Sequence, residues 1–476
     1  VGKGALGRAP RLRAVGGRAD GLGVWGGRVV AARHLRVERG VVERRPSSGS
    51  YVRSAPVTAA PPSTPGDQRL VDFWMNNESA IDLAISSPVE PPLDLLAANP
   101  LTHDTLLGSA VAHGYSAYGE PAMRRAAAER LTRQGFASSA DDVIITCGAQ
   151  QGLQLSLRAL VRPGDRVFVD SPAYPGLLAV LRQLDAVPIP VRCDAEGIVP
   201  RDLARAVGEF GPALVSTCSI GSNPTGALLT TKRRAELLDV IVQHDLVVLE
   251  DLTLVDTVLV DTVLDDTVLE DTVLEDTVLD PPATGPSRVA APLTSDGRVR
   301  GVAVGSASKL FWGGLRVGWV RTNESWLHTI AQGKALADFG TSPVTQGVTA
   351  GLLRQLHTDS RWHEKRRTEL RERRDLVIDL LHEHLPTWGV TAPAAGLSLW
   401  IRLPGTDGTQ FAAVADRYGV HVMPGEQCGI NGAYTDYVRI CYDRDAALLR
   451  EAVKRLALAY AEVGRLHARP PITVGP

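Results

Sequence analysis

Residues 306–319 read Ser-Ala-Ser-Lys-Leu-Phe-Trp-Gly-Gly-Leu-Arg-Val-Gly-Trp, the most informative stretch of the chain. A single lysine, Lys309, stands beside two small hydroxyl residues, Ser306 and Ser308, and Arg316 follows it in a glycine-bracketed turn. A lysine amine that attacks an aldehyde must be deprotonated, and a nearby cation or partial desolvation lowers its pKa. Hydroxyl groups and a guanidinium together bind a phosphate dianion, because Arg presents a rigid fork of donors.

An amine beside a phosphate site is the arrangement that holds pyridoxal 5′-phosphate, a cofactor carried covalently on lysine. The alternative interpretation is a surface Lys and Arg around a Gly-rich turn, because a motif alone is a hypothesis. The sequence predicts that Lys309 carries this cofactor and that the two serines and Arg316 bind its phosphate.

The stretch resembles the lysine motif of fold-type I aminotransferases, S-x-S-K-x-x-x-x-G-x-R-x-G. Residues 223–226, Asn-Pro-Thr-Gly, resemble the N-P-T-G turn of that family, which implies that Asn223 donates to the phenolic oxygen of the cofactor and borders the substrate. The short apolar run 247–249 ends in acids and reads as a buried strand that delivers a carboxylate at its end. The resemblance implies that Asp251 pairs with the pyridinium nitrogen and is a catalytic residue together with Lys309.

Other segments extend the resemblance in the expected order. Gly148, Ala149 and Gln150 follow an apolar strand and open a helix, where free backbone N–H groups form an anion site. The family places the cofactor phosphate there. By the same resemblance, the ring of Tyr174 packs against the cofactor, and Arg439 clamps the α-carboxylate of the substrate.

Residues 114–121 resemble the loop that reaches the cofactor of the partner subunit in family dimers, which implies a homodimer in which Tyr118 contacts the phosphate. The resemblance also implies an α/β, fold-type I architecture with a mixed, seven-stranded-type sheet. We expect a large α/β domain over residues 122–381. Residues 76–121 and 382–476 are expected to form a smaller α+β lobe, so the aminotransferase-like domain runs from residue 76 to the end.

The charge of the chain is unevenly distributed. Residues 1–53 carry twelve Lys or Arg against three Asp or Glu, a balance of +9, whereas the whole chain sums to −2. Such a basic segment on an acidic body indicates contact with DNA. Residues 34–52 resemble the end of a GntR-type winged helix with its two-stranded wing, and residues 19–32 resemble the helix-turn-helix. A GntR domain followed by an aminotransferase-like domain is the MocR architecture of bacterial regulators, and the Pro-rich residues 54–75 read as the linker between them.

The match to a winged helix is only partial. Nine glycines fall within residues 1–30, and the recognition helix would begin Trp25-Gly26-Gly27-Arg28. Each glycine inside a helix costs about 0.5–1 kcal/mol relative to Ala. Two interpretations stay open: a working DNA-binding domain, or a decayed leader that is basic only because it is rich in Arg.

The composition is that of an ordinary globular protein, with 476 residues, 44% of them hydrophobic and 22% charged. No run of 18 or more apolar residues exists, so we expect no membrane span. The beginning of the sequence lacks the apolar core of a signal peptide, and we expect a cytoplasmic protein. Five cysteines without a C-x-x-C pair predict reduced thiols, with neither a disulfide framework nor a metal site.

Residues 256–280 consist of five consecutive copies of Asp-Thr-Val-Leu-x, with nine acids and no base. A period of five fits neither a helix nor a strand, so no single apolar face forms along the array. We interpret one copy as part of the original chain and four as an expansion inserted after Asp251. A calcium-binding repeat is the alternative, although the array has no Gly for the tight loops of such sites.

One departure from the family affects the chemistry. Many members carry a Tyr two or three residues after the pyridinium Asp, whereas this chain has Thr253 and Leu254. Thr253 is expected to supply a weaker hydroxyl to the phenolic oxygen, and Gly313 replaces a Pro common in the lysine motif. The resemblance implies amino-group transfer between an α-amino acid and a 2-oxo acid. The alternative is a MocR-type transcription regulator that uses the same domain as a sensor and binds DNA through residues 1–53.

Overall fold

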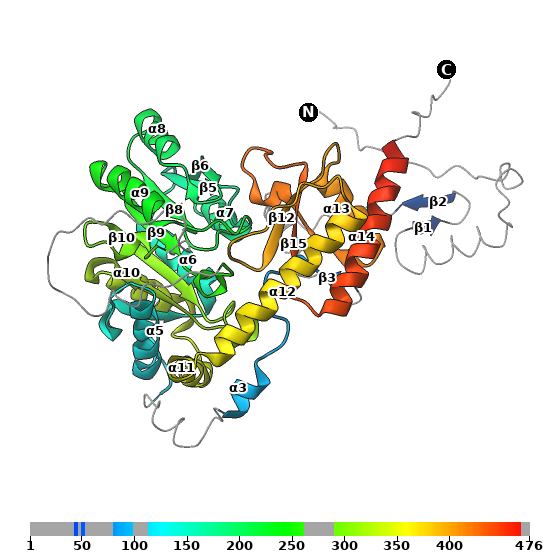
Figure 1. Ribbon diagram of the computed structural model, residues 1–476. Helices are drawn as coiled ribbons and strands as arrows, with labels where there is room; N and C mark the ends of the chain where they lie inside the picture. Colours follow the sequence, from blue (N-terminus) through cyan, green and yellow to red (C-terminus); the bar gives the residue numbers. More distant parts are fainter. Residues whose placement is uncertain (1–41, 46–48, 53–79, 99–112, 261–289, 468–476) are drawn as a thin grey trace, which may run out of the picture. The chain divides into compact units, whose positions relative to one another are not determined.

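The computed structural model describes residues 42–45, 49–52, 80–98, 113–260 and 290–467 (Figure 1). The chain divides into two compact units, residues 1–76 and 77–476. In the first unit, β1 (Val42–Arg45) pairs antiparallel with β2 (Gly49–Val52). This hairpin lies where the two-stranded wing is expected. The expected helix-turn-helix and the linker up to residue 75 lie outside the described residues.

The second unit contains an eight-stranded mixed sheet with the order β4-β11-β10-β9-β8-β5-β6-β7. Strands β6, β5, β8, β9 and β10 run parallel, and β11 is antiparallel to both of its neighbours. The strands are β4 (Val143–Thr146), β5 (Arg166–Ser171), β6 (Val187–Asp194), β7 (Gly197–Ile198), β8 (Leu214–Thr217), β9 (Val247–Asp251), β10 (Arg300–Ser306) and β11 (Gly318–Thr322).

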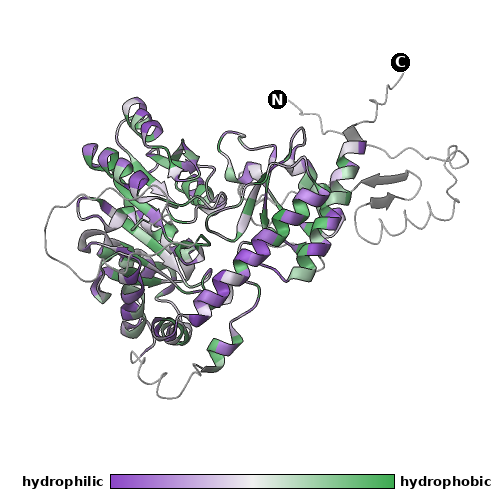
Figure 2. Cartoon of the chain, viewed as in Figure 1, coloured by the Kyte–Doolittle hydropathy of each residue, from purple (hydrophilic) through white to green (hydrophobic). Residues whose placement is uncertain are grey.

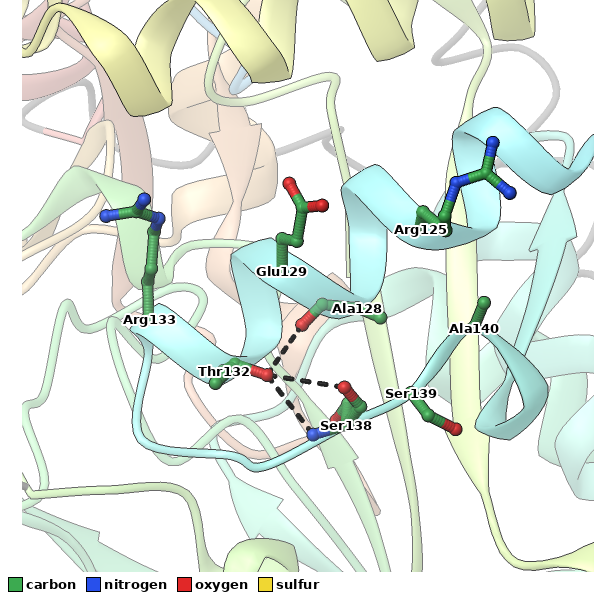
Figure 3. A pocket seen from close by; sticks show the side chains of 8 residues that line it. All are labelled: Arg125, Ala128, Glu129, Thr132, Arg133, Ser138, Ser139 and Ala140. Atoms are coloured by element: carbon green, nitrogen blue, oxygen red, sulfur yellow. Dashed lines mark hydrogen bonds between the residues drawn. The ribbon is translucent and has the colours of Figure 1, made fainter. Parts of the chain in front are cut away.

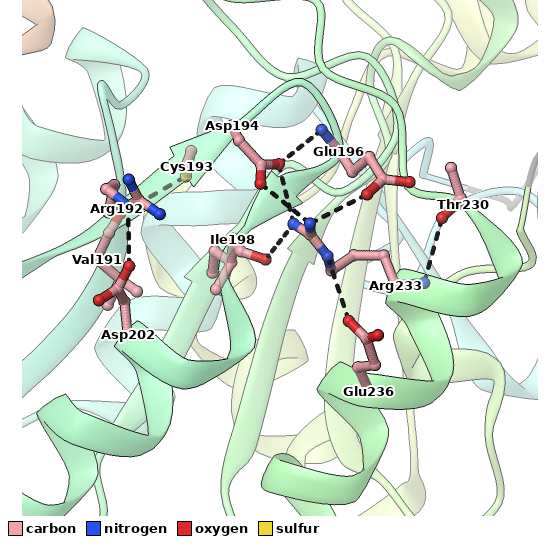
Figure 4. A network of polar contacts seen from close by, with 10 residues as sticks. All are labelled: Val191, Arg192, Cys193, Asp194, Glu196, Ile198, Asp202, Thr230, Arg233 and Glu236. Atoms are coloured by element: carbon pink, nitrogen blue, oxygen red, sulfur yellow. Dashed lines mark hydrogen bonds and ion pairs between the residues drawn. The ribbon is translucent and has the colours of Figure 1, made fainter.

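The sheet has one strand more than the seven expected, because the chain turns back after β6 and adds the two-residue β7. The turn requires a positive φ of 89° at Gly197, which glycine adopts without strain. Arg233 holds this turn from helix α9 (Thr231–Gln243; Figure 4). Its Nη1 donates to Asp194 at 2.9 Å and to the Ile198 carbonyl at 3.1 Å, and its Nη2 donates to Glu196 at 3.0 Å. The eighth strand is therefore fixed by a side-chain network, which the strand pattern does not indicate.

Helices cover both faces of this sheet. They are α5 (Pro121–Arg133), α6 (Gly148–Leu160), α7 (Pro175–Gln183), α8 (Pro200–Phe210), α9 (Thr231–Gln243), α10 (Glu324–Asp338) and α11 (Pro343–Thr358). Four of them carry Pro in the first turn, where a missing N–H costs nothing. Alternate strand residues face opposite layers: Ile144 belongs to the apolar cluster that includes residues of α6, α7 and α10, whereas Ile145 belongs to the cluster that includes residues of α5, α8, α9 and α11.

A smaller lobe has its own core. Its three-stranded sheet has the order β12-β15-β14, and β13 pairs in parallel with β3 near the start of the unit. The long helix α12 (Arg361–His384) contributes to this core from Leu370 onward. The other elements are β3 (Ile81–Asp82), β12 (Ser398–Arg402), α13 (Gly408–Arg417), β13 (Val420–His421), β14 (Met423–Pro424), β15 (Tyr437–Cys441) and α14 (Ala446–His467).

The remaining described elements are short: α3 (Leu93–Ala98) and the 3-10 turns η1 (Ala140–Asp142), η2 (Val255–Thr257), η4 (Leu293–Ser295), η5 (Gly313–Leu315) and η6 (Gly425–Cys428). Figure 2 shows the central strands in green and white, whereas α12 is largely purple along its length. Within the part of the chain that the structure describes, no helix combines the length and the apolarity needed to cross a membrane.

Candidate active site

The predicted site residues gather where the parallel strands end. Tyr174 follows β5, Asn223 follows β8, Asp251 ends β9 and Lys309 follows β10. Since the carboxyl ends of parallel strands meet at one edge of the sheet, residues far apart in the chain become neighbours there. The small lobe contributes Arg439 from β15 to the same place.

Lys309 is held in an environment that favours its neutral form. Its Nζ donates a hydrogen bond to the carbonyl oxygen of Ser86. Burial, and after it the positive charge of Arg439, lowers the pKa of the Lys309 ammonium to about 8. About a tenth of the amine is therefore unprotonated at pH 7, far more than for a lysine with the usual pKa, and nucleophilic attack on an aldehyde requires this neutral form.

Asp251 carries a carboxylate that interacts electrostatically with Lys309. Burial raises the pKa of Asp251, while hydrogen bonds from the Thr253 hydroxyl and amide and the charge of Lys309 oppose that rise. The Thr253 amide donates to Asp251 Oδ1 at 2.8 Å, and its hydroxyl donates to the same oxygen. The Thr253 hydroxyl thus orients Asp251.

Two glycines let Arg316 approach the start of α6. A Cβ added to Gly148 would lie 2.8 Å from Arg316 Nη2, and one added to Gly318 would lie 2.8 Å from the backbone nitrogen of Ala149. Arg316 itself has a φ of 52°, a left-handed conformation that is costly for a residue other than glycine. Its Nη2 donates to the Cys147 carbonyl at 3.1 Å.

This arrangement is suited to a phosphate. The first N–H groups of α6, at Gly148, Ala149 and Gln150, have no acceptor within the helix, and the helix dipole adds positive potential at the same point. A guanidinium aimed at a helix N-terminus completes an anion site. The side chain at the third position is engaged elsewhere, because Gln150 Oε1 accepts from the Tyr174 hydroxyl at 3.0 Å.

The two serines of the lysine motif differ in their contacts. Ser306 Oγ accepts a hydrogen bond from the Ser308 amide at 3.1 Å and donates to the Val317 carbonyl at 3.4 Å, so it shapes the loop that carries Lys309. The Ser308 hydroxyl makes no hydrogen bond within the described residues, which leaves it available for a ligand.

Tyr174 lies between these groups as a neutral phenol. Burial, followed by the negative charge of Asp251, raises its pKa to about 12. Tyr118 is placed differently: within its own chain its hydroxyl lies 3.3 Å from His328 Nδ1, and Arg124 stacks over its ring. Tyr174 therefore lies close enough to Asp251 to interact electrostatically with it. The side-chain contacts of Tyr118 are with His328 and Arg124, and not with the predicted site residues around Lys309 in the same chain.

Arg439 is a buried cation, 3% exposed, that has only neutral partners among the described residues. Its Nη1 donates to Asn223 Oδ1 at 2.9 Å, its Nη2 donates to the Ala84 carbonyl, and its Nε has no partner. A buried guanidinium without a carboxylate is costly to maintain. The incomplete pairing fits the predicted role of binding a carboxylate ligand.

Two features of the site were not among the residues predicted from sequence motifs. The segment from Ala84 to Ser86 places two carbonyl oxygens against Arg439 and Lys309, a contact made by backbone atoms. Asp170, near the end of β5, is a buried carboxyl whose pKa burial raises to about 6. Its position after an apolar strand is the same signal that identifies Asp251, and this signal was available in the sequence.

A separate pocket of about 380 Å³ lies along α5 (Figure 3). Thr132 Oγ1 donates there to the Ala128 carbonyl at 2.9 Å. Its lining comes from α5 and from residues 138–140, with none of the predicted site residues among them. The chemistry therefore concentrates at the sheet edge around Lys309.

The residues at that edge fit pyridoxal 5′-phosphate. They combine a lysine with a lowered pKa, a cradle for a phosphate that a Cβ at Gly148 would fill, a carboxylate at Asp251 and a buried arginine that lacks an acid. These four groups suit, in turn, the aldehyde, the phosphate and the ring nitrogen of the cofactor and the carboxylate of an amino acid attached to it.

Comparison with solved structures shows the same architecture. LysN, the alpha-aminoadipate aminotransferase from Thermus thermophilus solved with N-(5′-phosphopyridoxyl)-L-leucine, has a TM-score of 0.71 and 23% identity, over 84% of this chain and 95% of that one. An archaeal alanine:glyoxylate aminotransferase has a TM-score of 0.69 and 24% identity, over 83% of this chain and 94% of that one. The predicted fold-type I architecture is confirmed.

Sequence comparison finds relatives with a different description. The chain is 28% identical over 447 residues to the uncharacterized HTH-type transcriptional regulator YjiR of Escherichia coli (strain K12), covering 88% of this chain and 87% of that protein. It is 29% identical over 284 residues to the uncharacterized HTH-type transcriptional regulator YdfD of Bacillus subtilis (strain 168), covering 59% of this chain. That second match spans about half, 53%, of YdfD.

The family itself is defined by a match over most of the chain. The family model described as aminotransferase class I and II matches residues 81–456, which include every site residue from Tyr118 to Arg439. This chain belongs to the aminotransferase class I and II family.

Proposed function

We propose that this protein transfers an amino group between an α-amino acid and a 2-oxo acid, with pyridoxal 5′-phosphate on Lys309. The observation that carries the proposal is the environment of the Lys309 amine. Burial and the positive charge of Arg439 lower the pKa of this amine to about 8, and the negative charge of Asp251 acts on it in the opposite direction. Lys309 thus lies between Arg439, a cation that has no carboxylate partner, and Asp251, a carboxylate that forms no ion pair within the described residues. An amino acid and the ring of the cofactor supply the two missing charges.

When bound, the cofactor supplies a carbonyl carbon that accepts the amino group and a ring that withdraws electrons from the substrate Cα. Arg439 binds the substrate α-carboxylate and fixes the direction of the Cα–H bond. Asp251 keeps a proton on the ring nitrogen by its negative charge, and Thr253 orients that carboxylate. Lys309 Nζ would take the proton from Cα and deliver it to the carbon that accepts the amino group. This role suits an amine whose pKa is near the working pH.

Binding of the phosphate is assigned to the first turn of α6 at Gly148, Ala149 and Gln150, to Arg316 and to Ser308. The neutral Tyr174 covers the ring. We also propose a homodimer in which Tyr118 reaches the phosphate of the partner subunit, because its contacts within its own chain leave it apart from Lys309. Sedimentation tests the dimer, and a monomer with full cofactor content would contradict it.

The test of the main proposal is an assay with a panel of amino acids and one 2-oxo acid, with formation of the new oxo acid as the readout. Production that requires added pyridoxal 5′-phosphate supports transfer. Absence of turnover with all amino acids, together with retained cofactor binding, would contradict the enzymatic proposal and favour the second candidate.

That second candidate is a regulator of transcription. It is supported by the +9 balance of residues 1–53 and by the similarity to YjiR along 88% of this chain. We propose that DNA contacts residues 1–53 while the cofactor domain senses an amino acid or the cofactor itself. A gel-shift assay at two salt concentrations tests it, because binding through phosphate contacts weakens steeply with salt.

A further inference from the structure

Lys334, on α10, is a lysine whose side chain is 0% exposed. Its Nζ donates to both carboxylate oxygens of Asp338, at 2.9 Å each, and to Gln151 Oε1 at 3.0 Å. Burial lowers the pKa of Lys334, and the hydrogen bond and the negative charge of Asp338 oppose that fall. A buried cation is costly, and a long lysine side chain also loses its rotamer freedom there. Such a residue on a helix that faces solvent on its other side indicates a role for its contacts.

Gln151 connects Lys334 to the first turn of α6. Its Oε1 accepts from Lys334 and also from the Cys147 amide, at 2.7 Å, while its Nε2 donates to Asp338 at 2.7 Å. An ammonium and a backbone N–H can only donate and a carboxylate can only accept, so the orientation of the Gln151 amide group is fixed. Among the described residues the side chain of Cys147, the N-cap of α6, makes no capping hydrogen bond. Its amide therefore depends on Gln151.

The backbone of Cys147 extends this connection to the phosphate cradle. Its amide is bound by Gln151, and its carbonyl oxygen accepts from Arg316 Nη2 at 3.1 Å. Arg316 Nη2 also lies 2.8 Å from the place that a Cβ on Gly148, the first residue of α6, would take. A displacement of Cys147 would therefore move the guanidinium and the first N–H groups of α6 together. These are the groups assigned above to the cofactor phosphate.

The contribution of Lys334 is one of geometry rather than of charge. Burial acts to raise the pKa of Asp338, but hydrogen bonds from Gln151 and Lys334 outweigh it and lower that pKa, so the carboxylate is ionised beside the ammonium. An ion pair exerts little net force on a distant phosphate, because the fields of its two charges largely cancel. The pair therefore acts on the cradle through the hydrogen bonds of Gln151.

The neighbouring Gln150 shows that the first turn of α6 is held from two sides. Its Nε2 donates to the carbonyl of Gly176 on α7 at 3.2 Å, and its Oε1 accepts from the Tyr174 hydroxyl. Consecutive residues of a helix point about 100° apart. Gln150 thus reaches α7 and the ring of Tyr174, whereas Gln151 reaches α10 and its buried ion pair.

Asp338 also anchors the segment that carries Tyr118. Its Oδ1 accepts from the Gly340 amide at 2.9 Å, and Gly340 pairs with Ser116 in an isolated bridge. Gly340 has a φ of 139°, and a Cβ there would lie 2.5 Å from the Ser116 carbonyl oxygen, so this close approach requires glycine. One ion pair thus supports both the cradle at α6 and the loop 114–121.

We propose that Lys334 is a positioning residue for the cofactor phosphate. Its pair with Asp338 holds the start of α6 in place through Gln151 and the backbone of Cys147. This inference rests on the proposed cofactor site and adds to it a residue that acts only through its neighbours. Loss of Lys334 should weaken the binding of a phosphate group, whereas the attack of Lys309 on an aldehyde should continue.

The test compares two aldehydes that differ only in the phosphate. The apoprotein is titrated with pyridoxal 5′-phosphate and with pyridoxal, and absorbance gives an apparent Kd for each. Lys334→Met keeps a long, unbranched side chain and removes the charge. It should raise the Kd of pyridoxal 5′-phosphate by about tenfold or more and change that of pyridoxal by less than about twofold.

Two further variants separate this route from general destabilisation. Gln151→Leu should have the same selective effect, and the double variant should be no worse than either single variant, because both changes break one connection. Ile330→Ala is the matched control: Ile330 is 1% exposed, one turn before Lys334 on α10, in an apolar cluster with residues of α6. Its loss should lower the thermal midpoint and leave the ratio of the two Kd values unchanged.

An equal rise of both Kd values in Lys334→Met, or no change in either, would overturn the proposal, since Lys334 would then have a structural role only. An additive loss in the double variant would contradict the route through Gln151. If Lys334→Met does not fold, Asp338→Asn, a change at a partly exposed side chain, replaces it with the same expectation. A parent that binds pyridoxal 5′-phosphate no better than pyridoxal would contradict the phosphate site itself, and with it both the proposed function and this inference.

Discussion

Arg439 on the small lobe and Asn223 at the edge of the large sheet are joined by a hydrogen bond of 2.9 Å from Nη1 to Oδ1. The bond orients the guanidinium, and the remaining Nε has no partner in the described structure. Two residues separated by more than 200 positions are thus joined in one unit, which we propose binds a carboxylate. The predictions that follow depend on this unit and on its neighbours Lys309 and Asp251.

Replacement of Arg439 should weaken the binding of amino acids. A hydrogen bond to a charged group contributes about 1.5–3 kcal/mol, so Arg439→Gln should raise the apparent Kd of an amino acid by about 10- to 100-fold. Arg439→Lys should restore little, because an ammonium lacks the planar fork of donors. Titration of the holoenzyme with an amino acid, followed by absorbance, measures the effect. An unchanged Kd in both variants would show that the carboxylate binds elsewhere.

Replacement of Asp251 should separate cofactor binding from turnover. Asp251→Asn keeps the shape of the side chain but removes the negative charge that holds a proton on the ring nitrogen. We expect cofactor content to stay near that of the parent and amino-acid turnover to fall by at least about 100-fold, a loss of about 2.7 kcal/mol of transition-state stabilisation. A variant that turns over at the parental rate would show that Asp251 is not the partner of the ring.

Attachment of the cofactor should depend on pH through Lys309. Only the neutral amine attacks an aldehyde, so the rate at which the apoprotein combines with pyridoxal 5′-phosphate should rise with pH and level off above about 8, the pKa of Lys309. Arg439 lowers this pKa by its positive charge, so Arg439→Gln should move the inflection to higher pH. Stopped-flow absorbance over a pH series measures both curves. An inflection that moves downward in the variant would contradict the assigned charge interaction.

Removal of the repeat expansion should leave the fold intact. Deletion of residues 261–280 leaves the first copy with its contacts to Arg130 and Gly396, and shortening a loop has a small entropic effect, about 0.6 kcal/mol per factor of two in length. We expect parental cofactor content and an unchanged sedimentation coefficient after correction for mass. Loss of cofactor binding would show that the deleted copies belong to the folded domain.

The sequence predicted the fold, and it predicted which residues the strand ends bring together at the candidate site. Asp251 and Lys309 each follow an apolar strand, so the topology of a parallel sheet brings them together. The contacts of Ala84 and Ser86 were not predictable, since a backbone carbonyl carries no residue-specific signal. The hydrogen bond from the Thr253 hydroxyl to Asp251 was not predicted either, because a bond between residues two positions apart leaves no pattern in the sequence. Short-range bonds of this kind compete with any longer contact.

The most direct test of the account is to locate the cofactor on the chain. Reduction of the holoenzyme with borohydride fixes a lysine-bound cofactor, and peptide mass spectrometry then identifies the modified residue. We predict a single pyridoxyl group on Lys309, absent from Lys309→Ala and unaffected by Lys232→Ala, a change at an exposed lysine on α9. A pyridoxyl group on another lysine, or a parent protein that carries none after incubation with excess cofactor, would contradict the assignment of this site.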